Sequence, residues 1–440
     1  MGGVCNQVPF LKLGDQVNRV VITGMGVVAP NAHGLLHFEA ALRASVSGIA
    51  FRPELAQLSL GCQVAGVPPG GEALLATYLT APEYKRLNSC LSYAAIAALD
   101  CWQDAGFVVP SCRANRQVEW ETGAIIGTGI GGSLETAADT VIPLVDSGDY
   151  RRIGSTGVER MMNSGVSALT SSLLALGGLV TSNSNACATG AEAILFAAEH
   201  IRRGGASRML AGAAEGFSPY VCGGFDSMRL LNRTANADPH RASRPLSKTA
   251  AGFVPSAGAA ILLLESLTSA VARNARIYAE YLGGYANCGG HSGGGSMTAS
   301  NPAGVRRCIT AALHDAGVDG ADVDLVNGHF TGTGADIPSV LLLEEILDVD
   351  VETFPYLTAT KGLVGHALGA AGAIETVAAV LQLYSGFIHA NVNCEDLHPA
   401  LNHLADRIPT TTLDRQANVV MKTSFGFGDV NCCLLLRAWR

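Results

Sequence analysis

Thr181-Ser182-Asn183-Ser184-Asn185-Ala186-Cys187-Ala188-Thr189-Gly190 is the stretch that decides how this chain is interpreted. Its first half is polar, and an alanine-rich segment that predicts a helix over 188–203 follows directly. Cys187 therefore stands at the start of a predicted helix, where the positive end of the helix dipole lowers a thiol pKa and favours the thiolate. Most free cysteines are inert packing residues, but this position and its small neighbours predict that Cys187 is a nucleophile.

Outward from this turn, short apolar runs alternate with alanine-rich segments along the whole chain. The predicted strands are 20–23, 124–126, 259–264, 324–326, 419–421 and 432–436, and the predicted helices are 92–105, 188–203, 305–316 and 369–384. Strands that alternate with helices and are apolar on both faces predict an α/β protein with covered sheets. An internal boundary is predicted near 266–276, after the strand 259–264.

The composition excludes several classes of protein. The 440 residues carry a net charge of −8, which argues against nucleic acid as the main partner. Hydrophobic residues make up 48% and charged residues 15%, so we expect an oligomer that hides apolar surface. Twelve cysteines without a C-x-x-C pair predict no metal site and a reducing, cytoplasmic location. No membrane span or signal peptide is expected, and residues 1–17 are predicted to form a flexible leader.

Two glycine motifs resemble dinucleotide-binding fingerprints. Gly127-Thr128-Gly129-Ile130-Gly131-Gly132 fits G-x-G-x-x-G after a predicted strand, but no second strand ending in an acidic residue follows it. Gly24-Met25-Gly26-Val27-Val28-Ala29 also fits, but Pro30 interrupts the helix that it should open. Both motifs are predicted to be tight turns beside buried strands rather than nucleotide sites.

Two histidines lie in unusual contexts. Asn327-Gly328-His329-Phe330-Thr331-Gly332-Thr333-Gly334 places His329 in a loop just after the predicted strand 324–326. Thr360-Lys361-Gly362-Leu363-Val364-Gly365-His366 leads into the small residues 369–372, which permit close helix packing. A cysteine nucleophile needs a histidine nearby in space. A single histidine is more often structural, so the residues alone leave a catalytic and a structural interpretation evenly balanced.

Taken together, the motifs around Cys187, His329 and Lys361–His366 resemble those of the elongating Cys-His-His β-ketoacyl-acyl-carrier-protein synthases. The resemblance runs from about Val20 to Leu436. It includes Val20-Val21-Ile22-Thr23-Gly24-Met25-Gly26, Met228-Arg229-Leu230-Leu231 and Ser424-Phe425-Gly426-Phe427-Gly428.

The resemblance implies a thiolase-like, five-layered α/β/α/β/α fold with two similar halves, 18–270 and 271–440. It implies that Cys187 carries the acyl group while His329 and His366 assist decarboxylative condensation with a malonyl thioester. Lys361 would order the site with Glu375 as its carboxylate partner. The backbone N–H groups of Cys187 and Phe427 would form the oxyanion hole, with the Phe427 ring as a gate.

The resemblance also implies a binding pocket and partners. Ile130 and Phe330 are expected to line the pocket for the acyl chain. An acidic acyl carrier protein would deliver substrates on phosphopantetheine, with no cofactor bound by the chain itself and no metal. The basic residues expected to receive it are Lys85, Arg86, Arg151, Arg152 and Arg229, although ordinary surface charge explains each pair equally well. A homodimer is expected, and a heterodimer with another ketosynthase-like subunit is an alternative.

Several departures from the family pattern raise other hypotheses. The segment 243–260 lacks three charged groups and a glutamate of the pattern, so support for the site must come from elsewhere or be weaker. Phe330 replaces a glycine, Asp336 falls one residue early, Asp429 replaces a glycine, and Asn185 replaces a threonine. Within fatty-acid or polyketide/polyene chain elongation, these changes suggest a specialised paralogue that serves a secondary pathway rather than the housekeeping fatty-acid enzyme.

Two alternatives stay open. A partner subunit of the chain-length-factor type would shape a heterodimer without efficient catalysis, but such partners typically lack the nucleophile that this chain keeps. A degradative thiolase would use a second cysteine near the C-terminus. Cys432 and Cys433 lie there, but in a predicted strand rather than a loop.

Overall fold

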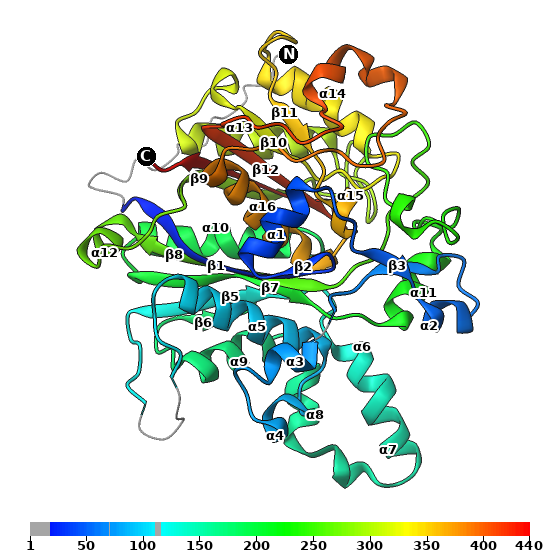
Figure 1. Cartoon of the computed structure of the whole chain (residues 1–440), viewed down its shortest axis with the longest axis vertical. Helices are drawn as coiled ribbons and strands as arrows, with labels where there is room; N and C mark the ends of the chain where they lie inside the picture. Colours follow the sequence, from blue (N-terminus) through cyan, green and yellow to red (C-terminus); the bar gives the residue numbers. More distant parts are fainter. Residues whose placement is uncertain (1–17, 70, 111–115) are drawn as a thin grey trace, which may run out of the picture.

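The computed structural model describes residues 18–69, 71–110 and 116–440, so the predicted leader 1–17 lies outside the described residues. The fold is built around one long mixed sheet that runs through both halves of the chain (Figure 1). In the N-terminal half, β1 pairs with β8, β8 with β7, β7 with β5 and β5 with β6. These strands are β1 (Val20–Ala29), β5 (Thr122–Gly127), β6 (Val180–Thr181), β7 (Arg208–Glu215) and β8 (Gly258–Ser266).

The C-terminal half supplies the other part of the sheet, in the order β9, β13, β12, β10 and β11. These strands are β9 (Ala279–Cys288), β10 (Leu325–Asn327), β11 (Tyr356–Thr358), β12 (Val419–Gly426) and β13 (Val430–Ala438). A short antiparallel contact between β1 and β9, from Val20 opposite Tyr281 to Ile22 opposite Ala279, joins the two parts.

The two parts of the sheet enclose a central pair of helices, α10 (Thr189–Arg202) and α16 (Ala371–Ser385) (Figure 1). The outer face of the N-terminal part is covered by α5 (Ser89–Asp104) and α9 (Gly165–Leu174). The outer face of the C-terminal part is covered by α13 (Pro302–Ala316) and α14 (Asp336–Leu347). The order helix, sheet, helix, sheet, helix is the predicted five-layered thiolase-like arrangement.

Small residues bring the central helices together. A β-carbon on Gly190 of α10 would lie 2.6 Å from the backbone nitrogen of Ala373, and one on Gly372 of α16 would lie 2.7 Å from that of Ala191. Only glycine leaves room for this approach. The expectation that residues 369–372 permit close helix packing is therefore confirmed.

The remaining elements form loops, edges and a projecting lobe. The short strands are β2 (Ala32–His33), β3 (Ile49–Phe51) and β4 (Val64–Gly66). The shorter helices are α1 (Leu35–Arg43), α2 (Pro53–Gln57), α3 (Gly71–Leu75), α4 (Ala81–Tyr84), α6 (Ser133–Thr136), α7 (Ile142–Asp146), α8 (Gly154–Met161), α11 (Pro219–Ser227), α12 (Leu267–Ala272) and α15 (Lys361–Val364). The lobe consists of α6, α7 and α8 and projects at the bottom of Figure 1.

All six predicted strands and four predicted helices are present, with shifted ends. β12 and β13 are longer than predicted because polar residues such as Lys422 and Asn431 continue them. The predicted helix 369–384 begins with a 3-10 turn at Leu368–Ala370 before α16. Among the described residues, the segment Leu368–Ser385 is long and apolar enough to cross a bilayer, but 89% of it is buried inside the protein, as is typical of a core helix.

Candidate active site

Cys187 lies in a tight turn that opens the central helix α10. Ala186 has a left-handed backbone, with φ of 46°, a conformation that non-glycine residues adopt only where their surroundings enforce it. The Thr189 hydroxyl donates to the Ala186 carbonyl at 2.7 Å and accepts the Asn185 N–H at 2.8 Å. The Asn185 side chain, a departure from the family pattern, donates to Glu192 on α10 at 2.5 Å. These contacts hold the thiol at the junction that the sequence predicts.

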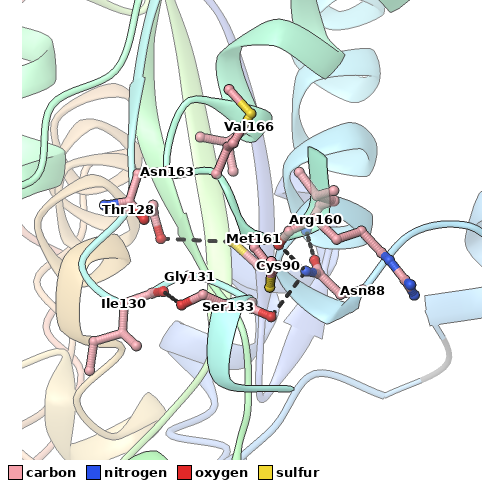
Figure 2. A pocket seen from close by; sticks show the side chains of 13 residues that line it. Asn88, Cys90, Thr128, Ile130, Gly131, Ser133, Arg160, Met161, Asn163 and Val166 are labelled. Atoms are coloured by element: carbon pink, nitrogen blue, oxygen red, sulfur yellow. Dashed lines mark hydrogen bonds between the residues drawn. The ribbon is translucent and has the colours of Figure 1, made fainter. Parts of the chain in front are cut away.

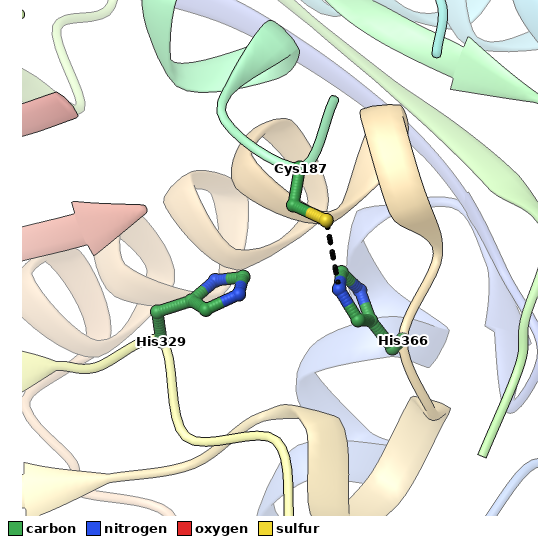
Figure 3. Close-up of side chains that lie close together, drawn as sticks. All are labelled: Cys187, His329 and His366. Carbon is green, nitrogen blue, oxygen red and sulfur yellow. Dashed lines mark hydrogen bonds between the residues drawn. The ribbon is translucent and has the colours of Figure 1, made fainter. Parts of the chain in front are cut away.

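His366 contacts the thiol directly. Its Nε2 lies 3.1 Å from the Cys187 Sγ, and its Nδ1 accepts the Leu368 N–H at 3.3 Å (Figure 3). Because Nδ1 is used as an acceptor, the ring hydrogen is on Nε2 and points toward the sulfur. Burial lowers the pKa of His366 to about 3, with the Lys361 charge as a further cause, so the ring is neutral at pH 7.

His329 reaches the same place from the loop after β10. The Lys361 Nζ lies 3.2 Å from its Nδ1, and the ammonium can only donate, so the ring hydrogen of His329 is also on Nε2. Burial and then the Lys361 charge hold the pKa of His329 well below its usual range. The two rings are 5.2 Å apart in a T-shaped arrangement. Two neutral imidazoles thus present N–H donors beside the thiol (Figure 3).

A buried charge network lies behind the histidines. Lys361 donates to the Oε1 of Glu375 on α16 at 2.5 Å, as the sequence predicts. A second lysine, Lys422 on β12, forms an ion pair with Glu375 Oε2 at 2.9 Å. All three side chains are at most 1% exposed. Glu375 is buried, which opposes ionisation, but the charges of Lys361 and Lys422 outweigh burial and lower its pKa.

The prediction that the helix dipole lowers the Cys187 pKa is wrong on balance. Burial raises the pKa of the thiol to about 11, while the Lys361 charge and the Phe427 N–H lower it by smaller amounts. The thiol sits inside the protein rather than in a solvated cleft, so desolvation of the thiolate dominates. Cys187 is therefore a thiol at rest and gains its charge only when a substrate reacts.

Phe427 supplies one of the groups expected at an oxyanion hole. Its backbone N–H donates to the Cys187 sulfur, and a β-carbon on Gly426 would come within 3.1 Å of the Cys187 nitrogen. The Phe427 ring starts a row of edge-on aromatic contacts: Phe225 at 5.9 Å, then Phe253 at 5.4 Å, then His366 at 5.2 Å. Packing contacts therefore link Phe427, the residue predicted to be a gate, to the ring of His366.

The first glycine motif binds a carboxylate of the chain itself. Glu215, at the end of β7, accepts the N–H groups of Gly129 at 2.9 Å, Ile130 at 2.9 Å and Gly131 at 2.5 Å. It also accepts the Gly369 N–H at 3.0 Å, which ties this loop to the loop of His366. Burial outweighs these bonds and raises the pKa of Glu215 to about 7. This motif is a turn, as predicted, and its N–H groups are already bonded to Glu215. The prediction of a turn is wrong for the second motif, because residues 24–29 are part of the strand β1.

Ile130 lines a small pocket, whereas Phe330 does not. The Ile130 pocket includes Cys90, Leu91, Thr128, Met162 and Val166 (Figure 2). Phe330 is 1% exposed and packs in the core of the C-terminal half, against Leu246, Val326 and Val340. Its ring fills the space beside Gly328. The expectation that Phe330 lines the acyl pocket is thus corrected: the ring points into the core behind the His329 loop.

The altered segment 243–260 is held by Asp396, an acidic residue outside the segment. Asp396 accepts from Arg244 at 2.7 Å, Ser247 at 2.6 Å and Thr249 at 2.7 Å. The segment then reaches the active site, where the backbone N–H of His366 donates to the Val254 carbonyl at 2.8 Å. We expected the support of the site by this segment either to come from other residues or to be weaker. The structure shows the first outcome, with Asp396 as the residue that holds the segment.

Two departures from the family pattern, the shifted Asp336 and the Asp429 that stands in place of a glycine, both bind backbone N–H groups. Asp336 accepts the N–H groups of Thr331 at 2.8 Å, Gly332 at 2.9 Å and Leu246 at 3.1 Å, so it joins the His329 loop to the altered segment. Asp429 accepts the N–H groups of His291 and Asn301, and thereby fastens the glycine-rich loop 289–295 to the β12–β13 turn. Sequence reasoning noticed both residues but assigned them no role.

The basic residues expected to receive a carrier protein are all exposed. Lys85 and Arg86 directly follow α4, and Arg151 and Arg152 lie in the 3-10 turn Tyr150–Ile153. Arg229 lies two residues after the end of α11. Arg152 pairs with Asp149 at 3.4 Å. The geometry is compatible with a docking role, which stays a prediction.

Three donor atoms at this site, from Cys187, His329 and His366, lie within 4.8 Å of one another, a spacing that could also hold a metal ion. However, the Lys361 ammonium contacts His329 at 3.2 Å. A fixed positive charge at that distance disfavours a cation between the rings. The cluster is therefore better suited to organic catalysis than to metal binding.

Sequence reasoning missed Lys422 and Glu215. A strand covered on both faces does not tolerate an unpaired charge, so a lysine in Val419–Gly426 and a glutamate closing Arg208–Glu215 were both signals of buried partners. Cys432 and Cys433 lie in β13, as predicted, and are fully buried. Because both lie inside a buried strand, neither is in a position to act as the second cysteine that a degradative thiolase would use.

The comparisons with known proteins agree with this geometry. Residues 17–270 match the N-terminal domain and residues 278–395 the C-terminal domain of beta-ketoacyl synthase. The chain is 34% identical to the chloroplastic 3-oxoacyl-[acyl-carrier-protein] synthase I of Arabidopsis thaliana, over 97% of this chain and 88% of that protein. It is also 34% identical to 3-oxoacyl-[acyl-carrier-protein] synthase 1 of Escherichia coli K12, over 96% and 99%.

Among solved structures, the ishigamide ketosynthase/chain length factor contains a chain that superposes with a TM-score of 0.84 at 27% identity, covering 96% of this chain and all of that one. Both the sequence and the arrangement of the site thus lead to one assignment. The chain belongs to the β-ketoacyl synthase family of thiolase-fold condensing enzymes.

Proposed function

We propose that this protein is a β-ketoacyl-acyl-carrier-protein synthase, which condenses an acyl group held on Cys187 with a malonyl group on a carrier protein. The observation that carries the proposal is the pair of imidazoles whose Nδ1 atoms are both occupied. Each ring can only donate from Nε2, and donors that face a thiol suit a reaction in which negative charge develops on a thioester oxygen.

In the first step the Cys187 sulfur attacks the carbonyl carbon of an acyl thioester. A new carbon–sulfur bond forms on Cys187, and the thiol of the carrier's phosphopantetheine leaves with the proton. The N–H groups of Cys187 and Phe427 would hold the oxygen of the tetrahedral intermediate. Because burial raises the pKa of Cys187 to about 11, the proton leaves as the bond forms rather than beforehand.

In the second step a malonyl thioester loses carbon dioxide, and its carbonyl oxygen takes up the negative charge of the enolate. The Nε2–H donors of His329 and His366 would stabilise that oxygen. The enolate carbon then attacks the acyl group on Cys187, the carbon–sulfur bond breaks, and the thiolate that leaves takes up a proton from solvent. The product is a β-ketoacyl thioester two carbons longer, still on the carrier.

The pocket lined by Ile130 is proposed to take the acyl chain, and the exposed basic residues named above to meet the acidic carrier protein. A cytoplasmic location is proposed as well. The division into functional halves at about residue 270 also stays a proposal. It is supported by the sheet, whose two parts are joined, among the described residues, through the β1–β9 contact.

A dimer is proposed from the apolar surface of the projecting lobe. Side chains of α6–α8 and the turns between them are exposed to an unusual degree: Leu134 41%, Ile142 54%, Val145 52%, Tyr150 57%, Val158 54% and Met162 51%. A surface of this kind is typical of a subunit interface. The related ketosynthase/chain length factor makes a heterodimer the alternative to a homodimer.

The decisive test is intact mass spectrometry of the protein after incubation with acyl carrier proteins loaded with short, long and unsaturated acyl groups. The expected result is one acyl adduct that is lost in Cys187→Ala, followed by a product two carbons longer once a malonyl carrier is added. Acylation without condensation would indicate a missing partner subunit. No adduct with any donor would favour a non-catalytic, chain-length-factor type of subunit.

The hypothesis of a specialised paralogue has its own test. The altered segment 243–260 motivates it, since Asp396 replaces the charges of the family pattern there. Expression of this chain alone in a strain that lacks its elongating synthase should fail to restore fatty-acid synthesis. Full restoration would refute the specialised role and leave the condensing activity intact.

A further inference from the structure

Two of the five lysines in the chain converge on one carboxylate in the core. Lys361 contacts Glu375 Oε1 and Lys422 contacts Glu375 Oε2, so each carboxylate oxygen faces its own ammonium group. One glutamate compensates only one lysine. The network therefore carries one surplus positive charge when all three groups are ionised, in a place where water does not screen it.

Lys422 is further connected to the catalytic loop through its neighbours on β12. Its Nζ donates to the Thr423 carbonyl and, at 3.0 Å, to the Ser424 hydroxyl. The Thr423 hydroxyl in turn accepts the backbone N–H of His329 at 3.2 Å. A chain of direct contacts thus leads from Lys422 to the His329 backbone, and a second one leads through Glu375 and Lys361 to the His329 ring.

We propose that Lys422 is a second positioning lysine of the condensing site, which holds Glu375 and the His329 loop so that both imidazoles keep their donors toward the substrate. Its ammonium group is engaged by Glu375, the Thr423 carbonyl and the Ser424 hydroxyl, so it acts through these groups and not on the substrate itself. The surplus charge also favours an anionic enolate over a protonated histidine in this site. This inference rests on the proposed condensing function.

The charge of Lys422 acts on the histidines more than on the nucleophile. It contributes to the low pKa values of both His329 and His366, whereas the main charged group that acts on Cys187 is Lys361. Loss of Lys422 should therefore slow the malonyl half of the reaction and spare the acylation of Cys187. A slower malonyl reaction with an unchanged rate of Cys187 acylation would indicate a positioning role, because general damage to the fold would slow both.

The first test is Lys422→Met, which removes the charge and keeps an unbranched side chain of similar length. The expected result is a fall of about tenfold or more in kcat for malonyl-carrier decarboxylation and condensation. KM for the malonyl carrier and the rate of Cys187 alkylation by iodoacetamide should each stay within about twofold. Met421→Leu, on the same strand but facing the outer core, is the matched control and should leave kcat unchanged.

The second test combines Lys422→Met with Glu375→Gln. Glu375→Gln alone leaves two buried ammonium groups without a counter-charge, and it should lower both kcat and Tm strongly. Adding Lys422→Met removes one of these charges. The proposal predicts that the double variant has a higher kcat and Tm than Glu375→Gln alone, although Lys422→Met lowers kcat in the wild-type background.

Three results would overturn the proposal: a wild-type kcat in Lys422→Met, a kcat that falls only in step with Tm, or a double variant worse than Glu375→Gln alone. If the wild-type protein itself performs no decarboxylation, the proposed function fails instead. The Tm values of the single and double variants still decide in that case whether Lys422 and Glu375 are coupled as a charged pair.

Discussion

Glu215 and Glu375 are both buried beside Cys187, but different groups surround their carboxylates. Glu215 accepts four backbone N–H groups, and its hydrogen-bond partners within the described part of the chain include no lysine or arginine. Glu375 contacts two ammonium groups. Burial raises the pKa of Glu215 to about 7, whereas the two lysines lower that of Glu375. Full opposite charges overcome desolvation at this depth, and aligned backbone dipoles do so only in part.

The difference also separates two tasks. Glu215 joins two glycine-containing loops, one at the pocket lined by Ile130 and one next to His366. A carboxyl group that is largely protonated is adequate for that. Glu375 must stay ionised, because its charge fixes Lys361, which sets the hydrogen position on His329. The same residue type thus serves as a backbone tie in one place and as a permanent charge in the other.

The largest effect is expected for Glu375→Ala, which removes the counter-charge of both lysines. Breaking a buried ion pair costs about 3–5 kcal/mol of folding free energy, and condensation should fall below detection because His329 loses its fixed hydrogen. Urea unfolding and a malonyl-carrier condensation assay measure the two effects. Full activity in this variant would show that Glu375 is not needed to order the site.

Glu215→Gln should have an intermediate effect. A glutamine offers one acceptor oxygen and brings an NH₂ group toward backbone donors, so part of the glycine loop loses its partner at about 1–3 kcal/mol. Acylation should slow for long acyl groups, since Ile130 lies in that loop, while malonyl decarboxylation changes little. Comparison of acylation rates with short and long donors tests this, and an equal loss for both would contradict it.

The two glutamates should also give opposite pH dependences. The folded pKa of Glu215 is raised, so its contribution to stability is complete below pH 4.5 and is lost as the pH rises through about 7. The folded pKa of Glu375 is lowered, so its contribution is present above pH 4.5 and is lost as the pH falls below that value. Between pH 5 and 8, Glu215→Gln should therefore weaken the decline of unfolding free energy that the wild type shows with rising pH. Identical slopes would place Glu215 in a fully ionised state.

The smallest effect is expected for Asp396→Asn, which removes a third carboxylate, one that lies near the surface. Its bonds to Arg244, Ser247 and Thr249 are partly exposed, and such pairs contribute about 1 kcal/mol or less. Tm should change by only a few degrees and condensation by less than about threefold. A large loss of activity without a loss of Tm would instead assign the altered segment a direct role at His366.

The sequence allowed prediction of the alternating elements and of five residues that converge, namely Cys187, His329, His366, Lys361 and Glu375. Each is marked by a local motif or by a fixed distance along the chain. Lys422 and Glu215 carry no motif, and their roles depend on strands that meet only after folding. The predicted direction of the Cys187 pKa shift is wrong, because the sequence indicates the start of a helix but not how deeply the thiol is buried.

Phe330 shows a further limit of the sequence. Its position next to His329 suggested contact with substrate, but neighbouring residues in an extended segment point to opposite sides. The His329 ring faces the active site, and the Phe330 ring faces the core of the C-terminal half. A pattern in the sequence predicts that two residues are close, and only the backbone decides which of them reaches the chemistry.

The last two strands make activity depend on a single pairing register. On β12, Lys422 lies opposite Leu434 on the side of the central helices, Thr423 opposite Cys433 on the other side, and Phe427 follows in the turn. A shift by one residue would exchange the faces of Lys422 and Thr423. The charge network, the His329 anchor and the Phe427 donor therefore cannot form separately: the pairing of β12 with β13 in this one register completes all three at once.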